Sequence, residues 1–186
     1  METPRPDTLD LPALIGARAR NLFLSRQMYC SEAVLVVLNK ALGGGLQDHQ
    51  AMALAAPFSE GVEKKGCICG ALAGALLAVG LFLGSSNPVG RRKAVQVASG
   101  ILMKSFKLRF GASCCRILSK KDQADSVPVF DRCAQQTAEA AAMAASIILK
   151  HRPGLKQDAD FDYLNARDSV AGGFMKNTLR RTGCRI

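Results

Sequence analysis

Cysteine is the residue type in this sequence whose number and spacing point most directly to chemistry. Four of the cysteines form two close pairs, one of pattern C-x-C and one of two adjacent residues. The seven cysteines are Cys30, Cys67, Cys69, Cys114, Cys115, Cys133 and Cys184. The sequence has no recognisable secretion signal, and thiols in a reducing compartment more often bind metal or carry out redox chemistry than form structural disulfides.

Four of the cysteines are predicted to lie at or near the start of a helix. These four are Cys30, Cys69, Cys115 and Cys133. The amino terminus of a helix carries partial positive charge and unpaired N–H groups, which stabilise a thiolate over a thiol. Four such helix starts, if they converge, would form a tetrathiolate metal site or a set of exchangeable thiols. The alternative for any single cysteine is a small buried hydrophobic residue.

The spacing excludes the commonest cysteine sites. The sequence has no C-x-x-C motif, which excludes a zinc ribbon and a thioredoxin-like site, and no C-x-x-C-H motif for covalent haem. The C-x-C and C-C patterns can chelate soft metals or form strained disulfides that are easily reduced. One interpretation is therefore thiol–disulfide exchange, in which one thiolate of a pair attacks and its neighbour resolves. The catalytic residues would then be Cys67, Cys69, Cys114 and Cys115.

The sequence around these cysteines resembles a known family. Residues 69–74 read CGALAG, a C-G-A-x-x-G pattern, which is similar to the signature of the redox-active family named C_GCAxxG_C_C. Other segments agree over about residues 17–149. They are CSEAV from Cys30, the Phe110-Gly111 pair that leads into CRIL from Cys115, and Cys133 ahead of an alanine-rich helix.

This resemblance implies a small helical protein with four characteristic cysteines that serve redox or electron-transfer work. A similar domain occurs in split-Soret cytochromes, where it accompanies haem and is associated with an iron–sulfur centre. Because the haem-attachment motif is missing here, the implied cofactor is an iron–sulfur cluster or another soft metal. The predicted metal ligands are Cys30, Cys69, Cys115 and Cys133. The extra Cys67, Cys114 and Cys184 depart from the four-cysteine pattern, and their roles stay open.

Two glycines and two glutamates near the cysteines are further candidates for the site. Gly70 and Gly74 leave a flat helix surface on which a second helix or a cofactor can approach, so we predict them to be cofactor-binding residues. Glu60 and Glu63 could tune a thiol site electrostatically, or could simply be solvated. A third class of function, a non-enzymatic helical binding module whose cysteines only pack, also remains open.

The elements that position these residues are predicted to be helices. Aromatic residues make up only 5%, Trp is absent, and the apolar content is Ala, Leu, Val and Ile with 17 Gly, which suits close-packed helices. We therefore expect an all-α, single-domain bundle of about six helices. The expected helices cover about 11–23, 31–42 with Ser31 as the capping residue, 48–54, 70–84, 90–110, a short one from about 113 to 118, and 129–150.

Composition divides the chain and limits its partners. We expect a helical redox domain at 1–154 and a basic appendage at 155–186 with one helical patch at 174–180. The net charge of +10 is scattered, without aromatic interleaving, which argues against nucleic acid and leaves an acidic redox partner as the alternative to solvated surfaces. The apolar run at 70–84 is shorter than the roughly 20 residues of a membrane span. A cytoplasmic protein is expected, and its glycine-lined helix faces would allow a homodimer.

Overall fold

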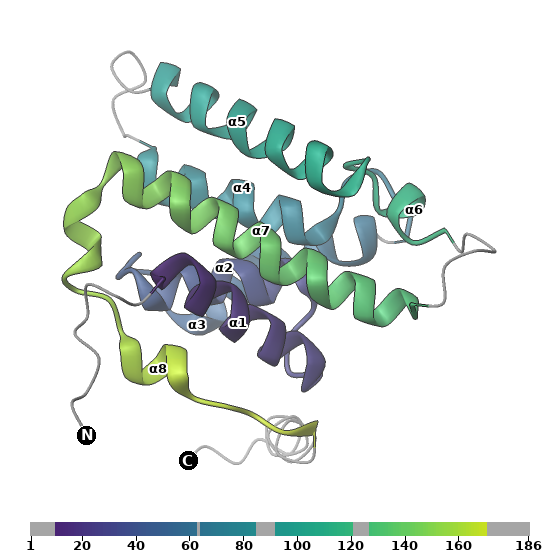
Figure 1. The fold of residues 1–186 in the computed structure, drawn as a ribbon, viewed down its shortest axis with the longest axis horizontal. Coiled ribbons are helices and arrows are strands. Elements are labelled where there is room, and N and C mark those ends of the chain that lie inside the picture. Colours follow the sequence, from purple (N-terminus) through teal and green to yellow (C-terminus); the bar gives the residue numbers. More distant parts are fainter. Residues whose placement is uncertain (1–9, 63, 85–91, 121–126, 171–186) are drawn as a thin grey trace.

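The computed structural model describes residues 10–62, 64–84, 92–120 and 127–170, and these residues form helices with no strand. The predicted all-α bundle is confirmed (Figure 1). The helices are α1 (Leu11–Leu24), α2 (Cys30–Ala41), α3 (Asp48–Ala55), α4 (Gly70–Leu83), α5 (Arg92–Phe110), α6 (Cys115–Leu118), α7 (Val129–His151) and α8 (Phe161–Asn165). Two 3₁₀ turns, η2 (Ala56–Gly61) and η3 (Pro153–Lys156), follow α3 and α7.

Helix α7 is the central element of the bundle (Figure 1). It packs against α1, α2, α4 and α5, while α2 also packs against α4. Small residues allow these close contacts, because the buried face of α7 is mainly alanine and α1 contributes a glycine at the crossing. A methyl group added to Gly16 would lie 2.7 Å from the carbonyl oxygen of Ala138. The predicted close packing of Gly/Ala helices therefore holds for the core.

The start of α2 differs from the prediction in its cap. The helix begins at Cys30, and the Ser31 hydroxyl, expected to cap it, is buried and hydrogen-bonded to the hydroxyl of Ser59 at 2.9 Å. The capping contact is made by Glu32, whose carboxylate accepts a hydrogen bond from the N–H of Tyr29 at 2.9 Å. The short helix predicted from about 113 begins two residues later, at Cys115.

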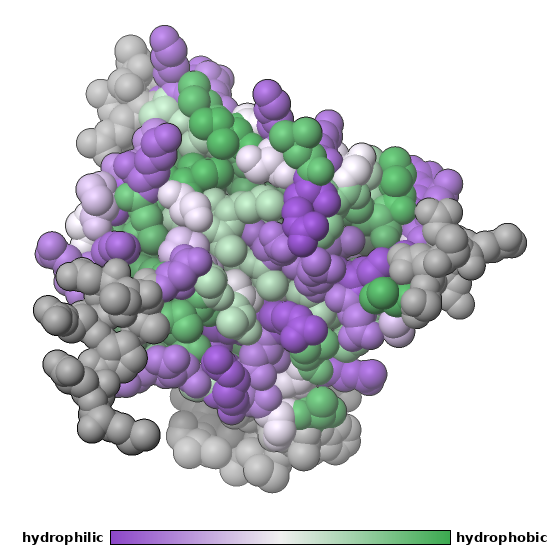
Figure 2. All heavy atoms as spheres, in the orientation of Figure 1, coloured by the Kyte–Doolittle hydropathy of each residue, from purple (hydrophilic) through white to green (hydrophobic). Residues whose placement is uncertain are grey.

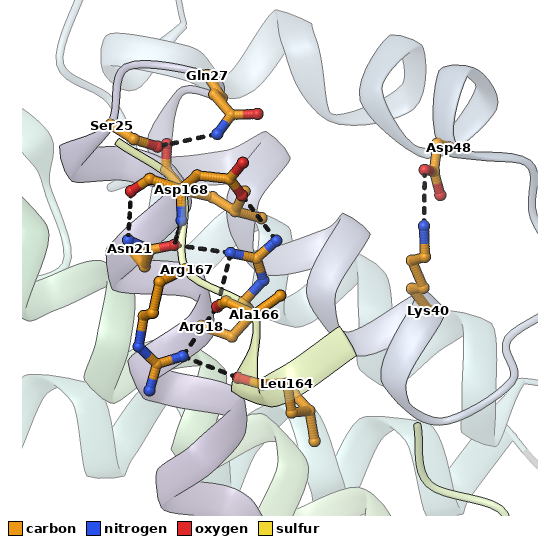
Figure 3. Close-up of polar contacts among 11 residues, drawn as sticks. Arg18, Asn21, Ser25, Gln27, Lys40, Asp48, Leu164, Ala166, Arg167 and Asp168 are labelled. Carbon is orange, nitrogen blue, oxygen red and sulfur yellow. Dashed lines mark hydrogen bonds and ion pairs between the residues drawn. The ribbon is translucent and has the colours of Figure 1, made fainter. Parts of the chain in front are cut away.

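The segment after α7 folds back along α1, and we call residues 161–168 the C-terminal strap (Figure 3). Arg18 of α1 is buried, forms an ion pair with Asp168 at 2.8 Å, and donates to the carbonyl of Ala166 at 3.1 Å. Asn21 donates to the carbonyl of Asp168 and accepts from its N–H, at 3.0 and 2.9 Å. The predicted helical patch at 174–180 lies outside the described residues.

The surface in view mixes hydrophilic and hydrophobic residues (Figure 2). The apolar α4 has 14 residues, and ten of them are buried inside the bundle. Within the described ranges, no helix combines the length and the apolar character that crossing a bilayer requires.

Candidate thiol site

The four cysteines predicted as ligands lie at or near the starts of four different helices. Cys30 is the first residue of α2, Cys69 directly precedes α4, and Cys115 is the first residue of α6. Cys133 lies about one turn into α7. The expectation that each cysteine sits near a helix amino terminus is therefore met by the local structure.

Glycines at the start of α4 bring that helix against α2. A methyl group on Gly70 would lie 2.5 Å from the Cys30 sulfur and 2.9 Å from the carbonyl oxygen of Phe58. A methyl group on Gly74 would collide with the carbonyl oxygen of Ser31. Both glycines thus face protein, and their absent side chains set the approach of Cys69 to Cys30. Their role as cofactor contacts stays a prediction.

A tightly turned loop joins α6 to the starts of α2 and α4. Gly61 and Gly66 have left-handed φ values of 76° and 73°, and a methyl group on Gly61 would lie 2.6 Å from Cβ of Cys115. Between them, Val62 also adopts a left-handed φ of 62°, which is rare for a β-branched residue. The N–H of Cys69 donates to the carbonyl of Ser113 at 2.8 Å. These contacts place the α6 turn beside Cys69.

Burial dominates the protonation of Cys69 and Cys30. It raises the pKa of Cys69 to about 12, with an added rise from charge on Cys30 and Cys115 that the backbone N–H of Leu72 opposes. Burial also raises the pKa of Cys30, against backbone N–H groups of Glu60 and Ser31 that lower it. Negative charge on Cys115 raises the Cys30 pKa further.

Burial and nearby charges also raise the pKa values of the other two thiols, Cys133 and Cys115. Burial raises the pKa of Cys133 to about 11, and charge on Cys30 and Cys115 adds to the rise. Burial likewise raises the pKa of Cys115, with a further rise from the Glu60 carboxylate. Charge on Cys30 or Cys115 would therefore disfavour ionisation of Cys69 and Cys133. The packing contacts of Gly70 with Cys30, of Gly61 with Cys115 and of Cys69 with Gln136 place the four thiols in one region. We call Cys30, Cys69, Cys115 and Cys133 the thiol cluster.

Gln136 is a neighbour of the cluster that sequence reasoning missed. This buried residue of α7 accepts a hydrogen bond from the Cys69 thiol, with 3.8 Å between sulfur and Oε1. With Phe110, Ile117 and others it also lines a pocket of about 380 Å³. The signal was present in the sequence, since Gln136 follows Cys133 by three residues and therefore shares its helix face.

The remaining cysteines are placed differently. Cys67 is exposed in the turn before α4, and its N–H donates to the carbonyl of Gly61 at 3.2 Å. Cys114 is half-buried directly before α6. Neither is among the groups that shift the pKa values of the thiol cluster. Cys184 and Glu63 lie outside the described residues.

The described cysteines are all free thiols. Among the described residues, no group of three or more His, Cys, Asp or Glu side chains is arranged to hold a metal ion. His49 and His151 are both exposed, on α3 and at the end of α7. Within the part of the chain that the structure describes, the thiol cluster is therefore a set of neighbouring free thiols without a preformed metal site.

Comparison with known proteins gives one match. A family model described as "Putative redox-active protein (C_GCAxxG_C_C)" matches residues 28–147. The comparison with curated proteins found no match, and neither did the comparison with solved structures. The matched segment extends from just before Cys30 to beyond Cys133, so it contains the whole thiol cluster. The chain therefore belongs to the C_GCAxxG_C_C family of redox-active proteins.

Proposed function

We propose that this protein carries out redox chemistry with the thiol cluster, and that its four sulfurs hold an iron–sulfur cluster or another soft metal ion. The observation that carries the proposal is that helix starts bearing these cysteines pack together. Gly70, next to Cys69, lies against the Cys30 sulfur, and Gly61 lies against Cβ of Cys115. Gln136, which follows Cys133 on α7, accepts a hydrogen bond from the Cys69 thiol. Membership in a redox-active family supports the general role. When bound, such a group would supply one-electron transfer.

The donor set fits this cofactor in kind. Thiolates are the ligands of iron–sulfur clusters and of other soft metals. Raised pKa values mean that the free protein keeps Cys69 and Cys133 protonated. Metal binding would release those protons, because a bound cation stabilises the thiolate form. Since no group of three described ligands is preformed, we expect loading to be accompanied by a shift of the helix starts.

The residues around the cluster have separate tasks under this proposal. Burial of Cys69 excludes water from its sulfur. In the metal-free protein Gln136 orients this sulfur by accepting a hydrogen bond from the thiol, a bond that would be given up when the thiol loses its proton to bind metal. Because Gly70 lets α4 pack closely against α2, the Cys30 sulfur lies next to the start of α4. Burial would keep the Cys69 ligand in a dry environment, which affects the redox potential of a bound group.

The test is metal analysis of protein purified without oxygen, before and after reconstitution with iron and sulfide. We expect bound metal and visible absorption that disappear in Cys69→Ser and Cys115→Ser. The matched variants Cys67→Ser and Cys114→Ser should retain both. Absence of iron, sulfide and any other soft metal after reconstitution would refute the metal proposal. Equal losses in all four variants would refute the assigned ligand set.

A metal-free alternative is favoured by one observation, the exposed Cys67 two residues from buried Cys69. In this reaction a Cys67 thiolate attacks a disulfide substrate, the substrate S–S bond breaks, and one substrate thiol leaves with a proton. Cys69, once deprotonated, then displaces the second substrate thiol, so two electrons pass to the substrate and a Cys67–Cys69 disulfide remains. The adjacent Cys114 and Cys115 form a second candidate pair.

Thiol counting separates this alternative from the others. Metal-free protein treated with a disulfide substrate should lose two thiols per reacting pair, and Cys67→Ser should prevent the loss at that pair. If the thiol count stays constant and no metal binds, the cysteines only pack. In that case Cys69→Ser would change stability and leave every redox readout untouched.

A further inference from the structure

Helix α5 has two apolar faces, and only one of them is used within the described fold. The inner face contains Ala98, Leu102 and Phe106, all fully buried against the bundle. The outer face carries large apolar residues that are open to solvent, with exposed fractions of 50% for Val97, 48% for Ile101 and 78% for Leu108. In Figures 1 and 2, the edge of the molecule formed by α5 shows hydrophobic patches between hydrophilic ones.

The outer face has the spacing of a coiled-coil seam. Its residues follow one another at intervals of three and four positions. They are Ala94, Val97, Ile101, Lys104 and Leu108. Such alternation keeps side chains along one line of a helix, where a second helix can pack over several turns. A narrow stripe of this kind matches a partner helix better than a broad or irregular surface.

The charge of α5 indicates what kind of partner helix could bind to its outer face. The described α5 carries five basic residues and no acid. Arg109 is paired with Glu139 at 2.9 Å, while Lys93, Lys104 and Lys107 form no ion pair with any described residue. Lys104 lies within the stripe, and the other two lysines lie on one side of it. The outer face is therefore apolar and positively charged at once.

We propose that the outer face of α5 binds an acidic amphipathic helix of a partner protein. A second copy of this chain would place like charges opposite one another along the seam. A membrane surface suits a broad face with large aromatic or leucine side chains, whereas this stripe is one residue wide and has no aromatic residue. An acidic helix satisfies both the spacing and the charge.

The location gives the interaction a consequence for the thiol site. Helix α5 ends at Phe110, and Cys114 and Cys115 follow within five residues. Figure 1 shows α6 beside the end of α5. A helix bound along the outer face would therefore reach the α6 turn. The interaction itself goes beyond the proposed redox function, because it depends only on the surface of α5.

The test uses the full chain and a synthetic peptide with Ile and Leu at heptad core positions and Glu at the flanking positions. The Glu side chains keep this peptide from pairing with itself, so binding reports on α5. We expect saturable binding by fluorescence anisotropy. Ile101→Ser should weaken it about tenfold, and Leu54→Ser should not change it. Leu54 is a suitable control because its exposure on α3, 54%, is close to the 48% of Ile101.

Charge reversal tests the second half of the proposal. Lys104→Glu should weaken binding of the acidic peptide about fivefold at low salt. The same variant should strengthen binding of a matched peptide that has Lys in place of Glu. Lys156→Glu, on η3, should change neither. No binding of the acidic peptide, or equal effects of Ile101→Ser and Leu54→Ser, would overturn the proposal. So would Ile101-dependent self-association, or Ile101-dependent binding to phosphatidylserine vesicles without peptide binding.

Discussion

Burial separates two cysteines that are only two residues apart in the chain. Cys67 is exposed in the turn before α4, whereas Cys69 is 3% exposed and hydrogen-bonded to Gln136. The thiolate is the nucleophile in alkylation, so access and pKa together determine the rate. The two members of the C-x-C pair should therefore differ in reactivity, and the difference bears on which of them can attack a substrate.

Alkylation of reduced, metal-free protein should label Cys67 well before Cys69. With a pKa of about 12, only about one Cys69 in ten thousand is a thiolate at pH 8. We expect Cys69 to react at least about a hundredfold more slowly than Cys67, with the rate rising as pH approaches 12. Peptide mass spectrometry after timed labelling measures both. Equal rates at pH 8 would contradict the burial of Cys69.

The raised Cys69 pKa also predicts a pH dependence of stability. Between 9.0 and about 12 the unfolded chain releases the Cys69 proton while the folded protein keeps it. The contribution of Cys69 to the free energy of unfolding should therefore be complete below pH 9 and should be lost as the pH rises toward 12. Urea unfolding of metal-free protein measures this slope, which should be smaller in Cys69→Ala. Cys67→Ala should keep the slope of the parent, and an unchanged slope in Cys69→Ala would contradict the prediction.

At the scale of elements, the close contact between α2 and α4 depends on two glycines of α4, Gly70 and Gly74. Gly74→Ala would push a methyl group into the backbone of Ser31, next to Cys30, and backbone cannot rotate away. We expect a loss of about 1–3 kcal/mol in the free energy of unfolding, measured by urea denaturation. It should be accompanied by faster labelling of Cys30, because the start of α2 is displaced.

Gly80 on the same helix is the matched control. A methyl group there meets nothing within 4 Å, so Gly80→Ala should stabilise the protein by up to about 1 kcal/mol through helix propensity alone. If Gly74→Ala and Gly80→Ala both raise the free energy of unfolding, the close packing of α4 against α2 at Gly74 would be contradicted.

The helices could be predicted from the sequence because their limits are local signals. Glycine and proline residues mark most of the ends, and the predicted spans at 11–23 and 129–150 differ from α1 and α7 by one residue at one end. The prediction that Ser31 caps α2 was wrong because its hydroxyl is hydrogen-bonded to the hydroxyl of Ser59, which lies in η2. A contact between distant elements cannot be read from the local pattern.

The four candidate ligands could be named from the sequence, but their arrangement could not, and their role as ligands stays a prediction. The resemblance to the family singled out Cys30, Cys69, Cys115 and Cys133, and the matched segment contains all four. Their proximity depends on the packing of α2, α4 and α7 and on the left-handed turns at Gly61 and Gly66. The contact of Gln136 with Cys69 depends on the same packing.

At the scale of the whole molecule, the strap ties the chain's later residues to its first helix. Arg18 falls in the apolar row of α1 yet is buried, because Asp168, Asn21 and the carbonyl of Ala166 accept its hydrogen bonds and charge (Figure 3). Its guanidinium also lies over the Tyr163 ring, 4.9 Å from the centroid. The contacts of the buried Arg18 side chain therefore hold the strap against α1.

Removing the charge from Asp168 should therefore destabilise the whole bundle. Asp168→Asn leaves the Arg18 cation, whose side chain is 6% exposed, without its counter-charge, and we expect a loss of about 1–3 kcal/mol. Asp48→Asn breaks the exposed pair with Lys40 and should cost less than about 1 kcal/mol. Urea unfolding compares the two variants. Equal losses would mean that the Arg18–Asp168 pair adds no more stability than the exposed pair. The expected difference, accompanied by faster proteolysis near residue 166, would show that this ion pair holds the strap on α1.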